Sequence, residues 1–564
     1  MVEFYLASSL EKVFADAAPA PLRENTLYSW PGESAAVQWV CHSPDGAPGM
    51  PARHYDLKIT GAPGPVSLFQ VDQMPVQLPC YEDSDEDYLR KTPGLYPDLL
   101  SPLAKNEILP LPRQYQSVWV KFHIPRNAAP GKYEIALTAV PRKRECTASG
   151  EWILNEEASE KQSTLTIHVG KNVLPPQKLI HTEWLHTDCL AEYYHLEVFS
   201  EAYWRVTENF IRAATENGIN MILTPVFTPP LDTPVGGERM TVQLMDVIRD
   251  QGKYSFHWSK LERWLEICRR ADIQYIEIPH LFTQWGAAAT PKIIAWESGE
   301  EKRIFGWDVP ADSSEYKRFL DAFLPALRSA LKAGGYDDEH VFYHISDEPD
   351  ERNKDAYLQA KGQTGHCLDS CRVLDALSSF SFYQLGLVDP PVCAADHIQP
   401  FLEAKAPHVW VYYCCAQGDR SPNRFLAMPS RRNRVMGVLM YLYGIEGFLQ
   451  WGFNFYHSRF SLYAIDPFRT ADADRSFPAG DPFLVYPGGG GKPLPSIRGE
   501  VQQEALTDLR LLQALEENIG RKRVEALIYE GESIYPFTFS DYPREDEYFL
   551  SLRERVAKAL DAEG

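Results

Sequence analysis

Residues 179–453 alternate between short apolar runs and longer amphipathic segments, and this alternation restricts the fold more than any other feature of the chain. Apolar, β-branched runs separated by helical patterns are typical of parallel βα units. Clear helices are predicted at residues 201–217, 260–271, 316–333 and 424–442. We count eight strands, at residues 179–184, 220–226, 275–281, 341–346, 372–377, 392–396, 408–414 and 447–453. This series predicts an α/β fold, a TIM-type (β/α)8 barrel with long loops, whose active site would lie at the C-terminal ends of the strands.

The chain before the barrel has a different character. It is rich in Pro and Gly and contains short alternating runs at residues 35–41, 66–71, 116–122, 133–140 and 164–169. This pattern predicts an N-terminal β-sandwich domain over residues 1–175. The sequence VLPP at 173–176 marks the boundary to a catalytic barrel over residues 176–520, and the charged residues 521–564 predict a C-terminal helical extension.

Composition excludes several classes of partner. The formal net charge of −21 argues against nucleic acid and anionic membranes, because both bind proteins through excess Lys and Arg. No secretory signal is readable and no apolar run is long enough to cross a bilayer, so we expect no membrane partner. The ten cysteines form no CxxC pair and are interpreted as reduced thiols of a cytoplasmic protein. The sequence does not decide whether the protein forms a homo-oligomer.

The fourth predicted strand ends in two adjacent carboxylates, within the sequence HVFYHISDEP at 340–349. Pro349 cannot donate to a sheet ladder, so we expect the strand to end near Ser346, with Asp347 and Glu348 at its C-terminal lip. Consecutive strand side chains point to opposite faces, so both acids can face one cavity only if the backbone turns there. At such a turn, Pro349 favours an extended conformation for Glu348. An acidic pair beside a proline also suits a helix N-terminus. Its place at the mouth of the predicted barrel favours catalysis.

Polar and aromatic side chains follow the other predicted strands and should converge on the same rim. They are His186, Asp188, Asp232, Arg239, His280, Gln284, Trp285, Trp307, Tyr412, Tyr413, Trp451 and Asn454. Aromatic rings supply stacking faces, and the polar groups supply hydrogen bonds to hydroxyls. A carbohydrate pocket needs this combination, so the predicted partner is a carbohydrate substrate.

Each of these candidates also has a purely structural interpretation. A single histidine such as His280 or His344 is more often a satisfied core residue, and Asp232 between prolines can simply cap a loop. The aromatic residues of the last strand can fill the barrel. A metal site is a further interpretation, with His181, His186 and His280 as candidate ligands. No compact spacing such as HExxH supports it, so neither a metal nor another cofactor is expected.

Four segments together carry a family resemblance. They are SDEP at 346–349, WGFNFY at 451–456, GDPFLVYPG at 480–488 and PSIRGE at 495–500. In combination they resemble proteins with the DUF4091 domain, which belong with glycoside hydrolase family 123. The resemblance covers roughly residues 180–520, and a sandwich that precedes a barrel is similar to that family as well.

The resemblance implies a β-N-acetylgalactosaminidase that works by substrate-assisted retention. The 2-acetamido oxygen of the substrate then attacks the anomeric carbon, in place of an enzyme nucleophile. By the same resemblance, Asp347 would orient the acetamido group and stabilise the oxazolinium charge, while Glu348 would protonate the leaving oxygen and then activate water. The adjacency of the two acids suits these roles. The usual retaining pair lies about 5 to 5.5 Å apart across the sugar, a geometry that neighbouring residues at one strand end do not naturally provide. A neighbouring negative charge also raises a carboxyl pKa, which favours the protonated acid at neutral pH.

Two alternatives stay open. The first is a glycosidase that pairs Glu348 with a carboxylate from another strand, Asp188, Asp232 or Asp375, and acts on a sugar without an acetamido group. The second is a non-catalytic carbohydrate-binding protein that keeps the barrel. The loops at residues 228–239 and 282–307 match no known substrate contacts, so the identity of the sugar is open.

Overall fold

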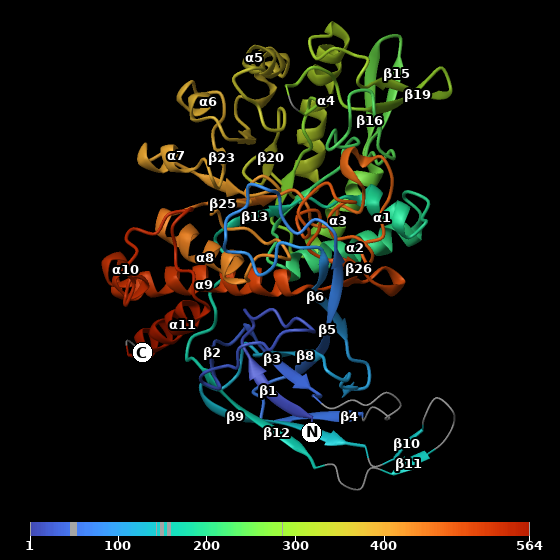
Figure 1. Ribbon diagram of the computed structural model, residues 1–564. Helices are drawn as coiled ribbons and strands as arrows, with labels where there is room; N and C mark the ends of the chain where they lie inside the picture. Colours follow the sequence, from blue (N-terminus) through green and yellow to red (C-terminus); the bar gives the residue numbers. More distant parts are fainter. Residues whose placement is uncertain are drawn as a thin grey trace.

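The computed structural model describes residues 2–44, 54–142, 144–146, 152–154, 159–284 and 286–562. The N-terminal sheets lie at one end of the molecule and a larger α/β part at the other, with the C-terminal helices along their junction (Figure 1). The hairpin of β5 and β6 rises from the sheets toward the barrel (Figure 1), and β6 contacts the long helix α9 (Ile497–Ile519).

Two five-stranded sheets form the N-terminal part. Their orders are β1-β3-β8-β5-β6 and β2-β12-β9-β4-β7, antiparallel throughout except for the parallel pair β2 and β12. The strands are β1 (Glu3–Ala7), β2 (Thr26–Ser29), β3 (Ser34–His42), β4 (Tyr55–Thr60), β5 (Val66–Val76), β6 (Gly94–Pro102), β7 (Glu107–Ile108), β8 (Tyr115–His123), β9 (Gly131–Pro141) and β12 (Lys161–Val169), with β10 (Arg144–Cys146) and β11 (Trp152–Leu154) as a separate pair.

Alternation along these strands explains the core between the two sheets. In β9, Ile135, Leu137 and Ala139 are buried while the residues between them are partly exposed. They share one hydrophobic cluster with Val118 and Val120 of the other sheet, so the two inner faces meet. The five strands predicted before residue 170 all lie within observed strands. The domain boundaries near residues 175 and 520 stay predictions.

A nearly closed parallel barrel forms the larger part. Its nine strands follow the order β21-β20-β17-β14-β13-β25-β24-β23-β22. They are β13 (Ile180–Glu183), β14 (Met221–Leu223), β17 (Tyr275–Glu277), β20 (Val341–Tyr343), β21 (Arg372–Val373), β22 (Asp375–Leu377), β23 (Pro391–Ala394), β24 (Trp410–Tyr412) and β25 (Gly447–Gln450). The two strands at the ends of this order, β21 and β22, are separated in the sequence by Leu374 alone, so the sheet nearly closes on itself. The prediction of an α/β fold with a parallel barrel behind N-terminal sheets is confirmed.

All eight predicted strand positions contain observed strands, which are shorter than expected. Side chains that point inward fill the barrel, among them Phe342, Trp410 and Leu449. Trp410 lies against Gly447, where a Cβ atom would come within 1.9 Å of the indole ring. The barrel interior is therefore a packed core.

Helices cover the barrel and lengthen the C-terminal end. They are α1 (Thr187–Tyr193), α2 (Glu201–Glu216), α3 (Ser259–Arg270), α4 (Ser314–Ala333), α5 (Lys354–Gln363), α6 (Phe380–Gln384), α7 (Gln399–Glu403), α8 (Arg431–Tyr443), α9, α10 (Arg521–Ile528) and α11 (Asp546–Ala562). The helix predicted at 424–442 begins later, at Arg431, because residues 424–430 include Pro429 and form a loop around the buried Arg424. Among the described residues, no helix is both long and apolar enough to cross a membrane.

The second predicted long loop contains regular structure. A four-stranded sheet, β16-β15-β18-β19, stands beside the barrel and includes β18 (Ile293–Glu297) and β19 (Glu300–Phe305). Its other strands are β15 (Asp246–Asp250) and β16 (Lys253–His257). The interpretation of residues 282–307 as one long loop is therefore wrong in part, since residues 293–297 and 300–305 form strands of this sheet.

Candidate active site

The acidic pair lies at the C-terminal end of the barrel. β20 ends at Tyr343, and the next residues remain paired with the neighbouring segment, because the backbone N–H groups of Leu281 and Phe282 donate to the His344 and Ile345 carbonyls (both 3.0 Å). Asp347 and Glu348 then line a cavity of about 140 Å³. The helix N-terminus interpretation is excluded, because α5 begins only at Lys354.

The backbone turns at Glu348. Its φ angle of 46° lies in the left-handed region, so the expectation of an extended conformation is wrong. Positive φ is uncommon for a residue other than glycine, and such conformations persist where the surrounding structure holds them. The turn brings two consecutive carboxylates to one cavity, which a regular strand could not do.

The two carboxyl groups have different surroundings. Asp347 is 9% exposed, whereas Glu348 is accessible to solvent within the cavity. Burial and the neighbouring Glu348 charge raise the pKa of Asp347 well above its usual range, although His344 opposes them. Desolvation by the crowded cavity walls also raises the pKa of Glu348, against a hydrogen bond from Tyr412. The pair therefore favours holding one proton in common.

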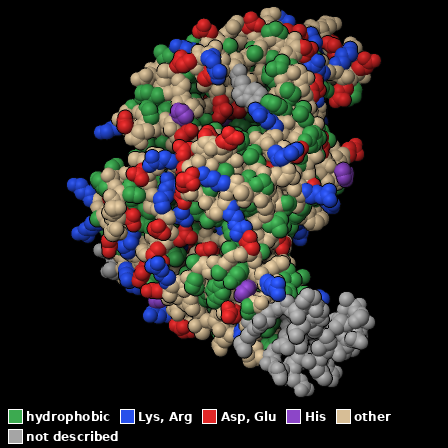
Figure 2. Space-filling view, in the orientation of Figure 1, with side chains coloured by type: hydrophobic (Ala, Val, Ile, Leu, Met, Phe, Trp, Pro, Cys, Tyr) green, Lys and Arg blue, Asp and Glu red, His purple; other side chains and the backbone are tan. Residues whose placement is uncertain are grey.

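Other predicted residues reach the same cavity. His186, Asp232, Gln284, Tyr412 and Trp451 line it together with the pair. Residues that were not predicted complete the walls: Trp184, Leu231, Ala376, Cys414, Cys415, Leu449 and Phe477. Several of these belong to the apolar barrel interior, so the floor of the cavity is the top layer of the core. Figure 2 shows acidic side chains gathered in a hollow of the surface over this part of the molecule.

Two neighbours contact the carboxylates directly. The Tyr412 hydroxyl donates to Glu348 Oε1 at 2.8 Å. The Gln284 side-chain amide donates to Asp347 Oδ2 at 3.4 Å, which is a long hydrogen bond. Glu348 is therefore held closely while Asp347 is held loosely.

Trp451 is fixed from two sides. Its indole N–H donates to Asp481 at 3.0 Å, and its carbonyl accepts a hydrogen bond from His186 Nε2 at 2.8 Å. Since Arg239 can only donate to His186 Nδ1, this histidine carries its proton on Nε2. Burial, together with Arg239, lowers the pKa of His186 to about 3, so the ring is neutral. The aromatic wall is thus set before any ligand binds.

The remaining predicted residues that the structure describes do not line this cavity. Asp188 and Arg239 form a buried ion pair (2.7 Å), and the Asn454 side-chain amide pairs with the His186 backbone. Tyr413 points away from Tyr412, against Phe448 on the outside of the barrel, because neighbouring strand residues alternate. Trp307 lines a separate pocket next to Arg239. Trp285 lies outside the described residues.

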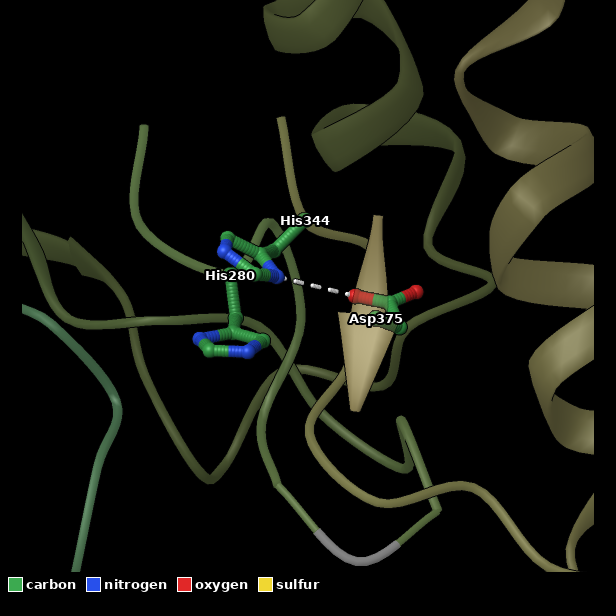
Figure 3. A group of neighbouring side chains, drawn as sticks. All are labelled: His280, His344 and Asp375. Atoms are coloured by element: carbon green, nitrogen blue, oxygen red, sulfur yellow. Dashed lines mark hydrogen bonds and ion pairs between the residues drawn. The ribbon is translucent and has the colours of Figure 1, made fainter. Parts of the chain in front are cut away.

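A buried polar cluster includes His280, His344 and Asp375 (Figure 3), and it lies next to Asp347, whose Oδ1 is 3.8 Å from His280 Nε2. His344 bonds Glu277 through Nε2 (2.7 Å) and Asp375 through Nδ1 (3.2 Å). Burial opposes protonation of His344, but these hydrogen bonds outweigh it and raise its pKa to about 9. The His280 ring packs on His344, with ring centres 4.3 Å apart.

This cluster includes the one group of potential metal ligands found among the described residues, His280, His344 and Asp375. The histidines proposed from the sequence are not brought together: His181 bonds Gly218 and His186 bonds Trp451. Because both nitrogens of His344 are taken by carboxylates, this ring has no free lone pair for a metal.

Long-range contacts account for the residues that sequence reasoning missed. Glu277 and Asp481 come from distant segments and act on the site through His344 and Trp451. The phenylalanine at 477 and the adjacent cysteines at 414 and 415 lack any local motif. A signal existed for Glu277, since it is an acid inside an otherwise apolar predicted strand.

Comparison with protein-family models identifies the domain that contains this site. The model of the glycoside hydrolase 123 catalytic domain matches residues 184–515, more than half of the chain. A search of curated proteins found no match.

Solved structures show where the fold recurs. A family 123 glycoside hydrolase from Clostridium perfringens, reported in work on glycolipid glycan hydrolysis, is similar over 100% of this chain and 98% of its own, with a TM-score of 0.74 and 14% identity. A Clostridium thermocellum endo-1,4-β-D-xylanase (TM-score 0.31, 9% identity, 90% and 94% covered) and a family 5 glycoside hydrolase from Bacteroides vulgatus (0.32, 13%, 66% and 72%) are far less similar and support no argument. The first similarity establishes the overall fold.

Proposed function

The chain belongs to glycoside hydrolase family 123, and from this premise we propose that it removes a terminal β-linked N-acetylhexosamine, with N-acetylgalactosamine as the preferred sugar. The observation that carries the proposal is the turn at Glu348, which brings two consecutive carboxylates of unequal burial to one cavity. A pair of this kind suits a reaction in which the substrate supplies the nucleophile.

In the proposed mechanism the acetamido oxygen attacks the anomeric carbon while Glu348 protonates the leaving oxygen. Ionised Asp347 accepts a hydrogen bond from the acetamido N–H and stabilises the positive charge of the oxazolinium. Glu348, now a carboxylate, then removes a proton from the water that attacks the anomeric carbon. This attack opens the oxazolinium ring, and the anomeric configuration is retained. The exposed position of Glu348 in the cavity supports the acid and base role, and the burial of Asp347 supports the electrostatic one.

The shared proton must lie on Glu348 for this reaction. In the free protein, burial favours placing it on Asp347. Binding of the acetamido group would stabilise the Asp347 carboxylate through a new hydrogen bond and shift the proton to Glu348. The aromatic wall around Trp451 and the apolar floor suit the faces of a sugar ring.

We also infer that the barrel is a TIM-type (β/α)8 barrel. Because Leu374 alone separates β21 and β22, these two strands together hold one position between β20 and β23. The cavity then lies where the active site of that fold is expected.

Replacing each carboxyl group by its amide tests the proposal. Glu348→Gln and Asp347→Asn should each lower kcat on an aryl β-N-acetylgalactosaminide, by roughly 10²- to 10⁴-fold for loss of the acid and base and by roughly 10²- to 10³-fold for loss of the charge. Glu351→Gln is the matched control, because Glu351 is an exposed acid in the same segment that bonds only Ser379 and Ser381 in the described structure. Unchanged rates in both test variants would overturn the assignment.

A second candidate mechanism uses two enzyme carboxylates on a sugar without an acetamido group. Asp188 is tied to Arg239, and Asp375 to His344 and Tyr357, so neither is available as the second carboxylate. Asp232 does line the cavity, and burial raises its pKa. Loss of activity toward an aryl β-galactoside in Asp232→Asn would favour this alternative.

A further inference from the structure

His280 is a buried histidine without a hydrogen bond. It is completely buried in the segment that follows β17, and within the described structure neither ring nitrogen has a hydrogen-bond partner. Buried polar groups in native proteins are nearly always bonded, so each exception needs an explanation. The carboxylate of Asp347 supplies one, because its Oδ1 lies 3.8 Å from His280 Nε2.

Burial and the positive charge of the neighbouring His344 keep His280 neutral. In the described structure, the Glu277 carboxylate accepts hydrogen bonds from Thr182, Trp184 and His344. Asp375 likewise accepts from His344, from the Tyr357 hydroxyl (2.7 Å) and from the Ile345 backbone N–H (3.1 Å). None of these contacts requires a proton on either carboxyl group, so His344 between them donates from both nitrogens as a cation.

A cation in ring contact opposes a second one. Burial and His344 together lower the pKa of His280 well below its usual range, so this ring carries a single N–H. The His344 ring packs on His280 (Figure 3), and the Trp184 ring meets it edge-on with ring centres 5.5 Å apart, so these contacts restrict rotation of the His280 ring. His280 is thus a neutral, oriented donor or acceptor beside a carboxyl group.

Asp347 has room for such a donor. Its only hydrogen bond among the described residues is the long one from Gln284. We propose that His280 is a positioning residue for Asp347. Its Nε2–H donates a hydrogen bond to the Asp347 carboxylate when that group is ionised and binds the acetamido group of the substrate. This inference rests on the proposed function. Hydrogen bonds of catalytic groups are often long without substrate and tighten in the complex.

A metal would give the same three residues another role. Binding of zinc through His280 and His344 would require His344 to give up one of its carboxylate partners and its proton. The contacts of the cluster are instead complete without an ion, apart from those of His280. The geometry therefore favours the role in positioning Asp347.

Two substitutions separate a hydrogen bond from a merely structural role. His280→Phe keeps a ring but removes the donor, and should lower kcat about 10- to 100-fold with little change in KM. His280→Gln places an amide N–H near the position of Nε2 and should restore most of the loss. His340→Phe is the control, because His340 is exposed and pairs with Asp337 away from the cavity. Should His280→Phe not fold, His280→Asn replaces it, since its shorter amide cannot reach Asp347.

The pH profile gives a second readout. A hydrogen bond to the ionised form lowers a carboxyl pKa, so its loss should raise the pKa of Asp347 and move the acid limb of kcat upward by about one pH unit. The groups that face Asp347, which are Glu348, His344, Asp375 and Gln284, are unchanged in these variants. Equal losses in the Phe and Gln variants with an unmoved acid limb would overturn the proposal. So would activity that is lost to a chelator and restored by zinc.

Infrared titration tests the contact without a substrate. The protonated-carboxyl band of Asp347 is the one that Asp347→Asn removes, and its midpoint should move upward in His280→Phe and return in His280→Gln. If the wild-type protein cleaves no N-acetylhexosaminide, the proposed function fails, yet this titration still decides the inference about His280. An unmoved midpoint in His280→Phe overturns it.

Discussion

Single residues with unlike surroundings give the acidic pair its chemistry. Asp347 is buried beside His280 and loosely bonded, whereas Glu348 faces the cavity and accepts a hydrogen bond from Tyr412. Since the two positions are consecutive, the difference comes from the backbone turn at Glu348 rather than from separate strands.

Removal of the Tyr412 hydroxyl should change the pH dependence in a defined direction. This hydroxyl stabilises the ionised form of Glu348, so Tyr412→Phe should raise the Glu348 pKa further. The acid then stays protonated to higher pH, and the alkaline limb of kcat/KM should move upward by about 0.5 to 1 pH unit, the equivalent of one hydrogen bond. The pH profile on an aryl β-N-acetylgalactosaminide measures this shift.

Tyr413→Phe is the matched control. The Tyr413 hydroxyl has no hydrogen-bond partner among the described residues and lies outside the cavity, so its removal should leave the alkaline limb in place. A downward shift in Tyr412→Phe, or equal shifts in both variants, would contradict the assignment of Glu348 as the acid.

The same two tyrosines show what residue patterns can predict. The acidic pair was recognisable because it follows a strand-like run, and strand ends in a parallel barrel share one face. Tyr412 and Tyr413 could not both face the cavity, since neighbouring strand residues alternate, but the pattern alone does not say which one does. Contacts such as Asp481 with Trp451 join segments 30 residues apart through loops that have no periodicity.

At the scale of elements, strand positions were predictable and strand ends were not. All eight barrel positions carry short apolar runs that are typical of buried strands, and each contains an observed strand. The ends depend on loops: β20 stops at Tyr343 because the chain must turn toward the cavity before Pro349. The sheet of β15, β16, β18 and β19 was missed in part because its exposed strands lack an apolar face, as in β19.

The start of α9 ties three elements together and should control stability. Arg498 donates to Asp98 of β6 (2.8 and 2.9 Å) and to the carbonyls of Gly480 and Phe483, next to the Asp481 that anchors Trp451. Arg498→Met leaves the buried Asp98 without its counter-charge, and should lower the free energy of unfolding by about 3 to 5 kcal/mol. Urea unfolding followed by tryptophan fluorescence measures the loss.

An exposed ion pair provides the comparison. Lys178 and Glu517 are more than half exposed, so Lys178→Met should cost at most about 1 kcal/mol. Equal effects of the two substitutions would contradict the view that Arg498 holds the loop of the site against the N-terminal sheets.

On the scale of the whole molecule, the C-terminal helices join the two parts. Arg553 of α11 contacts Asp508 of α9 and Glu33 of the N-terminal part, and residues of α11 enter the main hydrophobic core. The net negative charge of the chain does not oppose binding of the neutral sugar proposed as substrate, since that ligand needs no electrostatic attraction. The molecule thus carries the two carboxylates at the C-terminal end of its nearly closed barrel.

The rates on a series of aryl β-galactosaminides with N-acetyl, N-difluoroacetyl and N-trifluoroacetyl groups test the central claim most directly. Fluorine withdraws electrons from the acetamido oxygen and weakens it as a nucleophile without removing it from the pocket. If that oxygen attacks the anomeric carbon, kcat should fall steeply along the series and the matching aryl β-galactoside should not be cleaved. Rates that stay level along the series, with cleavage of the galactoside, would show that an enzyme carboxylate attacks instead.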